Sequence, residues 1–172
     1  MTSIHDFTVV SYQQILGAVS GFLDKGAKHC AEHNINPQEF VDARIHPDML
    51  PLSFQINSVA HHSLGAIKGV QAGEFGTPPN IGAVDYARLQ AMVAEARDGL
   101  SKFSAADVNA LSGKDVIFKL GDFKIPFTAE GFLLSFSLPN FYFHATTAYD
   151  ILRMKGVKLG KRDFLGTMRV KG

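Results

Sequence analysis

Residues 138–153 read LPNFYFHATTAYDILR, and this stretch decides more about the fold than any other part of the chain. Its apolar residues recur at helical spacing, and the same period turns Pro139, Asn140 and His144 toward a core. A proline and two polar side chains at such positions each reduce stability. We therefore expect a core-packed helix that also carries whatever functional site the protein has.

Three further segments share this period, with apolar residues at alternating steps of three and four. Four amphipathic segments of this length predict an all-α fold, a four-helix bundle. A chain of 172 residues with 46% hydrophobic residues fits one domain spanning residues 1–172. The predicted core-facing positions are Tyr12, Leu16, Val19, Leu23, Gly26 and Cys30; Leu52, Ile56, Val59, Ser63, Ala66 and Val70; Tyr86, Leu89, Val93, Ala96, Leu100 and Phe103; and Phe132, Phe136, Pro139, Phe143, Thr147, Ile151 and Met154.

Residues 116–127, VIFKLGDFKIPF, break the helical period. Apolar and other residues alternate on both sides of Gly121-Asp122, which fits a two-residue turn with glycine first. Pro126 cannot donate a ladder hydrogen bond, so the second strand belongs at an edge. The sequence predicts a small β-hairpin inserted between the third and fourth helices.

Pro139 interrupts the fourth helix. Because proline has no backbone N–H, we expect the helix to kink or to restart with Pro139 in its first turn. Either arrangement frees backbone carbonyls near Asn140 and His144, and a freed carbonyl inside a bundle needs a partner.

Composition excludes several classes of function. The formal net charge is +1 with no dominant basic face, which argues against nucleic acid as a partner. No apolar run reaches the ~18 residues of a membrane span, and no leader pattern is visible at the start, so we expect a cytoplasmic protein. The single Cys30 cannot form a disulfide framework and is predicted to pack in the core.

Two histidines are the strongest site candidates. His62 is three residues after one core position and four before another, so it should face the bundle interior, whereas His61 should be solvated. His62 and His144 could meet there as metal ligands or proton carriers. The alternative is a pair of core-edge histidines satisfied by Thr147, Asn140, Gln55 or the backbone. Asp48 lies just before the second helix, where the helix dipole stabilises a carboxylate. Its presence there therefore needs no functional role.

The segments ARIHPDM (43–49), LPNFYFH (138–144) and ILR (151–153) are similar to those of an uncharacterised domain-of-unknown-function family within the DinB/YfiT-like superfamily. The resemblance implies a DinB-like four-helix bundle, often a homodimer, in a superfamily that includes metalloenzymes. Metal-binding members use one histidine on helix two and a His-x-x-x-His pair on helix four. His62 and His144 match two of these positions, but Ala148 stands at the third, so a triad for Zn or Ni is incomplete.

These observations lead to one expectation and two alternatives. We expect a cytoplasmic bundle whose polar pocket, formed by His62, Asn140 and His144 with Asp48 and Tyr149, binds a small molecule or ordered water without a tightly held metal. The enzyme alternative is a metal-dependent hydrolase or thiol S-transferase with His62 and His144 as ligands. The third possibility is a non-catalytic structural or interaction protein that forms a dimer.

Overall fold

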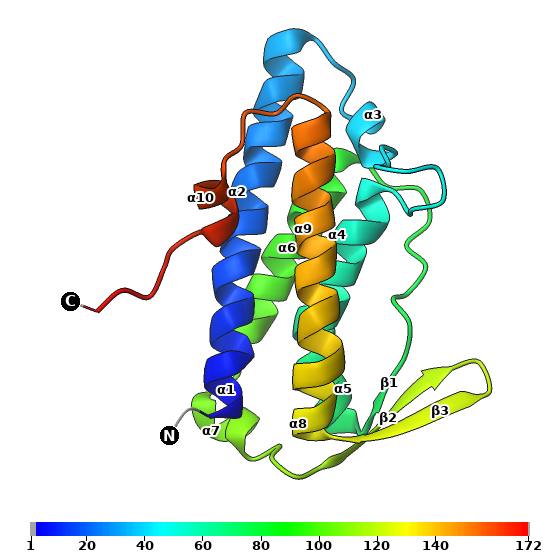
Figure 1. The fold of residues 1–172 in the computed structure, drawn as a ribbon, viewed down its shortest axis with the longest axis vertical. Helices are drawn as coiled ribbons and strands as arrows, with labels where there is room; N and C mark the ends of the chain where they lie inside the picture. Colours follow the sequence, from blue (N-terminus) through cyan, green and yellow to red (C-terminus); the bar gives the residue numbers. More distant parts are fainter. Residues whose placement is uncertain (1–2, 172) are drawn as a thin grey trace.

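The computed structural model describes residues 3–171 and consists of a four-helix bundle with a small sheet at one end (Figure 1). Two of the four bundle helices are interrupted by a π-helical turn, labelled η1 and η2. The predicted all-α class with an inserted hairpin is confirmed. The bundle comprises α2 (Val9–His33); α4 (Leu52–Ala60) continued by η1 (His61–Gly65) and α5 (Ala66–Ala72); α6 (Tyr86–Ser101); and α8 (Ala129–Phe132) continued by η2 (Leu133–Ser137) and α9 (Leu138–Met154).

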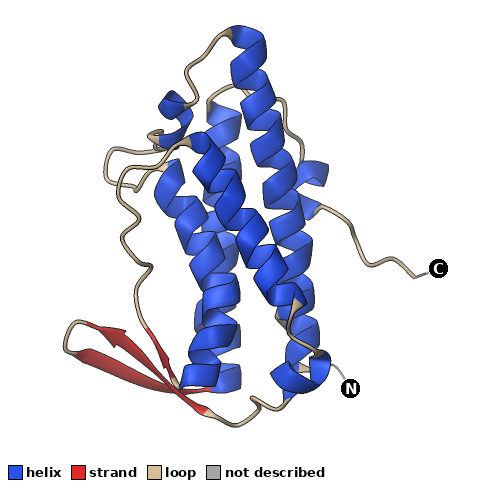
Figure 2. Cartoon of the chain, turned by 180° about the vertical axis from the view of Figure 1, so that it is seen from behind, coloured by secondary structure: helices blue, strands red, loops and turns tan. Residues whose placement is uncertain are grey.

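The helices form a square in which α2 and α4 each pack against α6 and α9. The connection of residues 76–85 runs back along the bundle, so α4 and α6 run in the same direction (Figures 1 and 2). Helices α4 and α9 run in opposite directions, since His62 faces Ser137 while Gln55 contacts His144. This arrangement brings η1 and η2 to the same level of the bundle.

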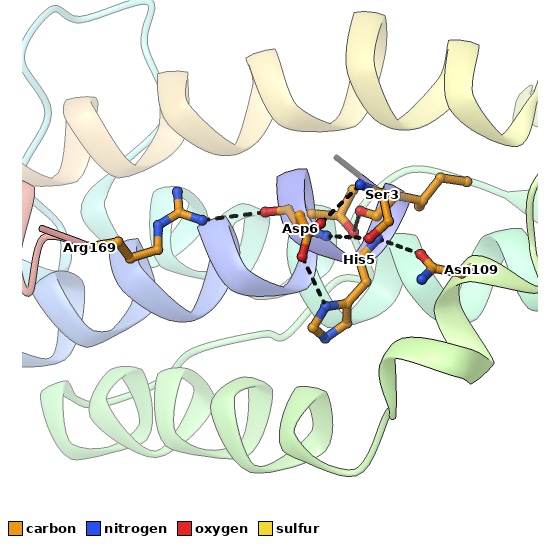
Figure 3. Close-up of polar contacts among 7 residues, drawn as sticks. Ser3, His5, Asp6, Asn109 and Arg169 are labelled. Atoms are coloured by element: carbon orange, nitrogen blue, oxygen red, sulfur yellow. Dashed lines mark hydrogen bonds and ion pairs between the residues drawn. The ribbon is translucent and has the colours of Figure 1, made fainter. Parts of the chain in front are cut away.

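Four short helices surround the bundle: α1 (Ile4–Phe7) and α7 (Ala105–Asn109) lie together at one end, α3 (Gln38–Val41) lies near the other end, and α10 (Lys161–Leu165) packs against the side of α2 (Figure 1). A capping box starts α1, in which Ser3 Oγ accepts from the Asp6 amide at 3.3 Å and the Asp6 carboxylate accepts from the Ser3 amide at 2.9 Å. The His5 amide donates to Asn109 Oδ1 at 3.1 Å, and the Arg169 guanidinium donates to the Asp6 carbonyl at 3.5 Å (Figure 3). The start of the described chain is thereby fixed to α7 and to the C-terminal segment.

The hairpin consists of β2 (Asp115–Leu120) and β3 (Phe123–Thr128), which pair antiparallel with Leu120 opposite Phe123. Gly121 opens the two-residue turn with a positive φ of 58°, a conformation that favours glycine. Strand β3, with Pro126, lies at the edge as predicted. A third strand, β1 (Glu74–Phe75), pairs parallel to β2. A strand of two residues carries no measurable period, so β1 could not be predicted from the sequence.

The predicted core-facing positions of the first two helices are all buried, and those of the third are buried except for the partly buried Phe103. The fourth helix differs: Pro139, Phe143 and Met154 are exposed, which corrects the prediction. A π-helical turn takes up about one more residue than an α-helical turn, so η2 shifts the buried face forward along α9. The buried positions of α9 are Leu138, Phe141, Ala145, Thr147, Ala148, Ile151 and Leu152, so the predicted positions Thr147 and Ile151 are confirmed.

Candidate functional site

The two predicted histidines meet in the bundle. His62 lies in η1 and is 4% exposed, and His144 lies half-buried on the facing side of α9. Their ring centroids are 5.9 Å apart and their planes are within 17° of parallel. The two residues are 82 positions apart in the chain, and the antiparallel packing of α4 and α9 brings them together.

A chain of hydrogen bonds fixes the protonation of His144. The Gln55 amide nitrogen donates to the Leu50 carbonyl at 2.8 Å, which turns Gln55 Oε1 toward the His144 ring. His144 Nδ1 lies 2.7 Å from that oxygen, and an amide oxygen can only accept, so Nδ1 carries the proton. The Nε2 atom of the neutral ring is therefore an acceptor.

The other ring, His62, has an unsatisfied atom. Its Nδ1 is buried and has no hydrogen-bond partner among residues 3–171. The ring lies among aromatic side chains, with the Phe75 centroid at 5.4 Å and the Phe136 centroid at 5.8 Å. An unpartnered buried nitrogen costs about 1–3 kcal/mol, so this position is not optimised for stability.

Both rings are neutral at physiological pH. Burial lowers the pKa of His62 to about 3, with smaller contributions from the neighbouring His61 and His144. Burial also lowers the pKa of His144 to about 4. Because neither ring is charged, the pair can accept hydrogen bonds or bind a Lewis acid, but it offers no positive charge to an anion.

The two π-helical turns are linked directly beside His62. Ser137 Oγ in η2 donates to the His62 carbonyl at 2.8 Å, and the Tyr12 hydroxyl of α2 donates to Ser137 Oγ at 3.3 Å. Within η1, Ser63 Oγ donates to the Val59 carbonyl at 2.7 Å. Both serine hydroxyls thus donate to backbone carbonyls in or next to the wider turn of η1. Single π-helical turns occur frequently at functional sites.

The remaining predicted residues have other partners. The Asn140 amide donates to the Phe136 carbonyl at 2.7 Å, one turn back, and so satisfies backbone near the helix restart. The Asp48 side chain is 81% exposed and pairs with His46 in the loop before α4. Tyr149 packs edge-on against Phe22 and Phe164 on the side of α2 and α10. The structure therefore does not bring Asp48 or Tyr149 to the histidine pair.

The exposure of His61 also differs from the prediction. Its ring is partly buried rather than solvated, because it stacks on Phe75 with centroids 4.2 Å apart. Its Nε2 donates to the Gly76 carbonyl at 2.8 Å. The parallel pairing of β1 with β2 holds Phe75 and Gly76 in place, and this strand was not visible in the sequence.

The donor set does not fit a tightly bound catalytic metal. A zinc–nitrogen bond of about 2 Å puts the centroids of two bound imidazoles roughly 5–6 Å apart, so His62 and His144 alone have a suitable spacing. Residues 3–171, however, contain no group of three or more His, Cys, Asp or Glu side chains placed to hold an ion. Ala148, four residues after His144 in α9, is fully buried and offers no side-chain ligand atom. Catalytic zinc sites use three protein ligands.

The fold is that of the DinB class. A crystal structure of a DinB family member from Shewanella denitrificans matches with a TM-score of 0.81 at 24% identity, covering 98% of this chain and 94% of that one. Residues 4–165 match the profile of DUF1993, a domain of unknown function, so the chain belongs to the DUF1993 family. None of the curated proteins matches the chain. No helix among residues 3–171 is long and apolar enough to cross a membrane.

Proposed function

We propose that this DinB-like protein is a cytoplasmic, single-domain binding protein whose His62–His144 pair holds a small hydrogen-bond donor without a tightly held metal. The observation that carries the proposal is the buried His62 Nδ1 with no partner among the described residues. Groups of this kind are rare in folded proteins, and an unplaced ligand or water is a common explanation.

The hydrogen-bonding state of the two rings supports a particular class of ligand. His144 Nε2 is an acceptor because Gln55 holds the proton on Nδ1. Both rings are neutral, with pKa values lowered by burial. Water, a hydroxyl or an amide N–H therefore suits the pair better than a carboxylate or a phosphate. The surrounding Phe54 and Phe136 rings add apolar contact area.

Two measurements test this proposal. Nitrogen-15 spectra of the histidine rings should show saturable shifts of His62 and His144, but not of exposed His46, when acetamide or glycerol is added. Metal analysis of protein purified without chelators should find far less than one equivalent of nickel or zinc. Unchanged ring signals would contradict the ligand, and stoichiometric metal would contradict the metal-free site.

A metal-dependent hydrolase or thiol S-transferase is the second candidate. The observation that favours it is the Gln55–His144 hydrogen bond, because metal-binding histidines commonly donate their second ring N–H to an oxygen acceptor. In that case His144→Ala should abolish metal retention while helical content stays nearly unchanged. The variant His46→Ala, in the exposed loop, is the matched control.

A homodimer is supported by the projecting hairpin (Figure 1). Three apolar side chains near its tip are exposed, with Phe123 at 74%, Leu120 at 55% and Ile125 at 43%. Exposed apolar groups of this size, gathered on one strand pair, are typical of an interaction surface. Sedimentation velocity of the wild type and of Phe123→Ser tests the role of the hairpin. We expect a dimer that the substitution dissociates, and a monomeric wild type would refute the proposal.

A further inference from the structure

A cavity of about 250 Å³ lies on the opposite side of η1 from the histidine pair. It is bounded by α4 and η1 on one side, by α6 on the other, and by residues 79–81 of the connection that runs back along the bundle. His61 and His62 are adjacent in η1, but their side chains point to different sites. His61 lines this cavity, whereas His62 faces His144 of α9. The cavity is thus distinct from the site described above.

The walls of the cavity are mainly apolar. They include Ala60, Leu64, Ile81, Met92 and Ala96. Leu64 packs closely on α6, since a Cβ at Gly99 would be 2.4 Å from Leu64 Cδ2. Contact between Leu64 and Gly99 thus joins the two helices that form the walls of the cavity.

A buried amide holds the opposite wall in place. Asn57 Nδ2 donates to the Pro79 carbonyl at 2.8 Å, and Asn57 is 5% exposed. This bond joins α4 to the connection and positions Ile81 against the cavity. A hydrogen bond between a buried side chain and a loop carbonyl gives an otherwise exposed segment a defined position.

The rim of the cavity carries a net positive charge. Arg88 and Glu95 of α6 form an ion pair, with Arg88 Nη2 3.2 Å from Glu95 Oε2. Lys68, on the other side, forms no ion pair with any of residues 3–171. His61 adds no charge at neutral pH, because burial lowers its pKa. Lys68 is thus the uncompensated charge at the mouth.

We propose that this cavity binds a small organic acid, with the apolar body between α4 and α6 and the carboxylate at Lys68. The apolar walls and the single positive charge at the rim are complementary to such a ligand. A cavity of about 250 Å³ has room for a short aliphatic acid, and hexanoate combines an apolar chain with one carboxylate.

Backbone amide NMR titrations with three probes of equal chain length test the proposal: hexanoate, hexan-1-ol and hexylamine. Hexanoate should give saturable shifts at Ala60, Leu64, Ile81 and Met92. Hexan-1-ol should bind more weakly at the same amides, and hexylamine should not bind there. The absence of hexanoate shifts at these amides, or equal binding of hexylamine, would overturn the proposal.

Two variants separate the charge from the cavity. Lys68→Gln should weaken hexanoate binding by about tenfold and leave hexan-1-ol unaffected, as expected for one charge-assisted hydrogen bond. Lys102→Gln, an exposed lysine just after α6 that does not line the cavity, is the matched control. Ala60→Leu fills the cavity and should abolish binding of both probes while helical content is retained. Hexanoate binding that survives Ala60→Leu in the folded variant would place the ligand elsewhere.

Discussion

Lowering the pH from about 7 to about 5 should destabilise this protein through the buried His62 and the half-buried His144. In the folded state the pKa of His62 is about 3 and that of His144 about 4, below the ordinary value of 6.5. Below pH 6.5 the unfolded chain takes up protons at these two histidines and the folded chain does not. The stabilisation is therefore complete above pH 6.5 and is lost as the pH falls toward the folded-state pKa values.

The magnitude follows from the width of this window. Each proton taken up only by the unfolded state costs about 1.4 kcal/mol per pH unit, so His62 should contribute about 2 kcal/mol between pH 6.5 and 5. His144 is half-buried and partly screened by solvent, so its contribution is smaller. A total loss of roughly 3 kcal/mol is a large part of the 5–15 kcal/mol typical of a folded domain.

Urea unfolding followed by circular dichroism at a series of pH values measures this loss. The double variant His62→Gln/His144→Gln should be less stable at neutral pH but should show a much flatter dependence on pH between 7 and 5. His46→Gln, an exposed histidine in a loop, is the control and should keep the wild-type slope. A double variant that also kept the wild-type slope would refute the assignment to the buried pair.

Three further predictions concern packing and hydrogen bonding. Gly26→Ala should destabilise the protein by about 1–3 kcal/mol despite the better helix propensity of alanine, because its Cβ would lie 2.2 Å from the Tyr86 hydroxyl. Gly21→Ala, in the same helix with nothing within 4 Å of its Cβ, should instead stabilise by about 0.5–1 kcal/mol. Thermal unfolding of both variants shows whether each substitution raises or lowers the melting temperature. A stabilising Gly26→Ala would show that the Tyr86 contact is absent. Gln55→Met should cost about 1–2 kcal/mol by removing the acceptor for His144 Nδ1. Ring nitrogen-15 shifts should then show mixed tautomers for His144, and a single retained tautomer would contradict the role of Gln55.

Much of the fold could be predicted because its signals are local. The apolar period placed Leu16, Val59 and Val93 in the core, and all three are fully buried. The hairpin was predicted from alternation around Gly121 and from the position of Pro126, and its turn and edge strand are as expected. Such features depend on residues a few positions apart, so one sequence contains the whole signal.

The site could be predicted only in part. The helical period placed His62 inside the bundle and on the side of His144, and the two rings do meet. Asp48 and Tyr149 were also predicted to belong to the pocket, but their contacts lie elsewhere. A period gives the direction of a side chain on one helix, but it does not give the level at which two helices cross.

The sequence by itself determined the four helices of the bundle, the inserted hairpin and the inward direction of His62. Only the tertiary structure decided the register of the fourth helix, which η2 shifts so that Pro139 and Phe143 are exposed. The bond from Ser137 to the His62 carbonyl joins the two π-helical turns across 75 positions of the chain. A π-helical turn is unfavourable alone and is stabilised here by contacts between distant residues. For that physical reason, neither the shifted register nor the polar geometry around His62 and His144 is visible in any local stretch of sequence.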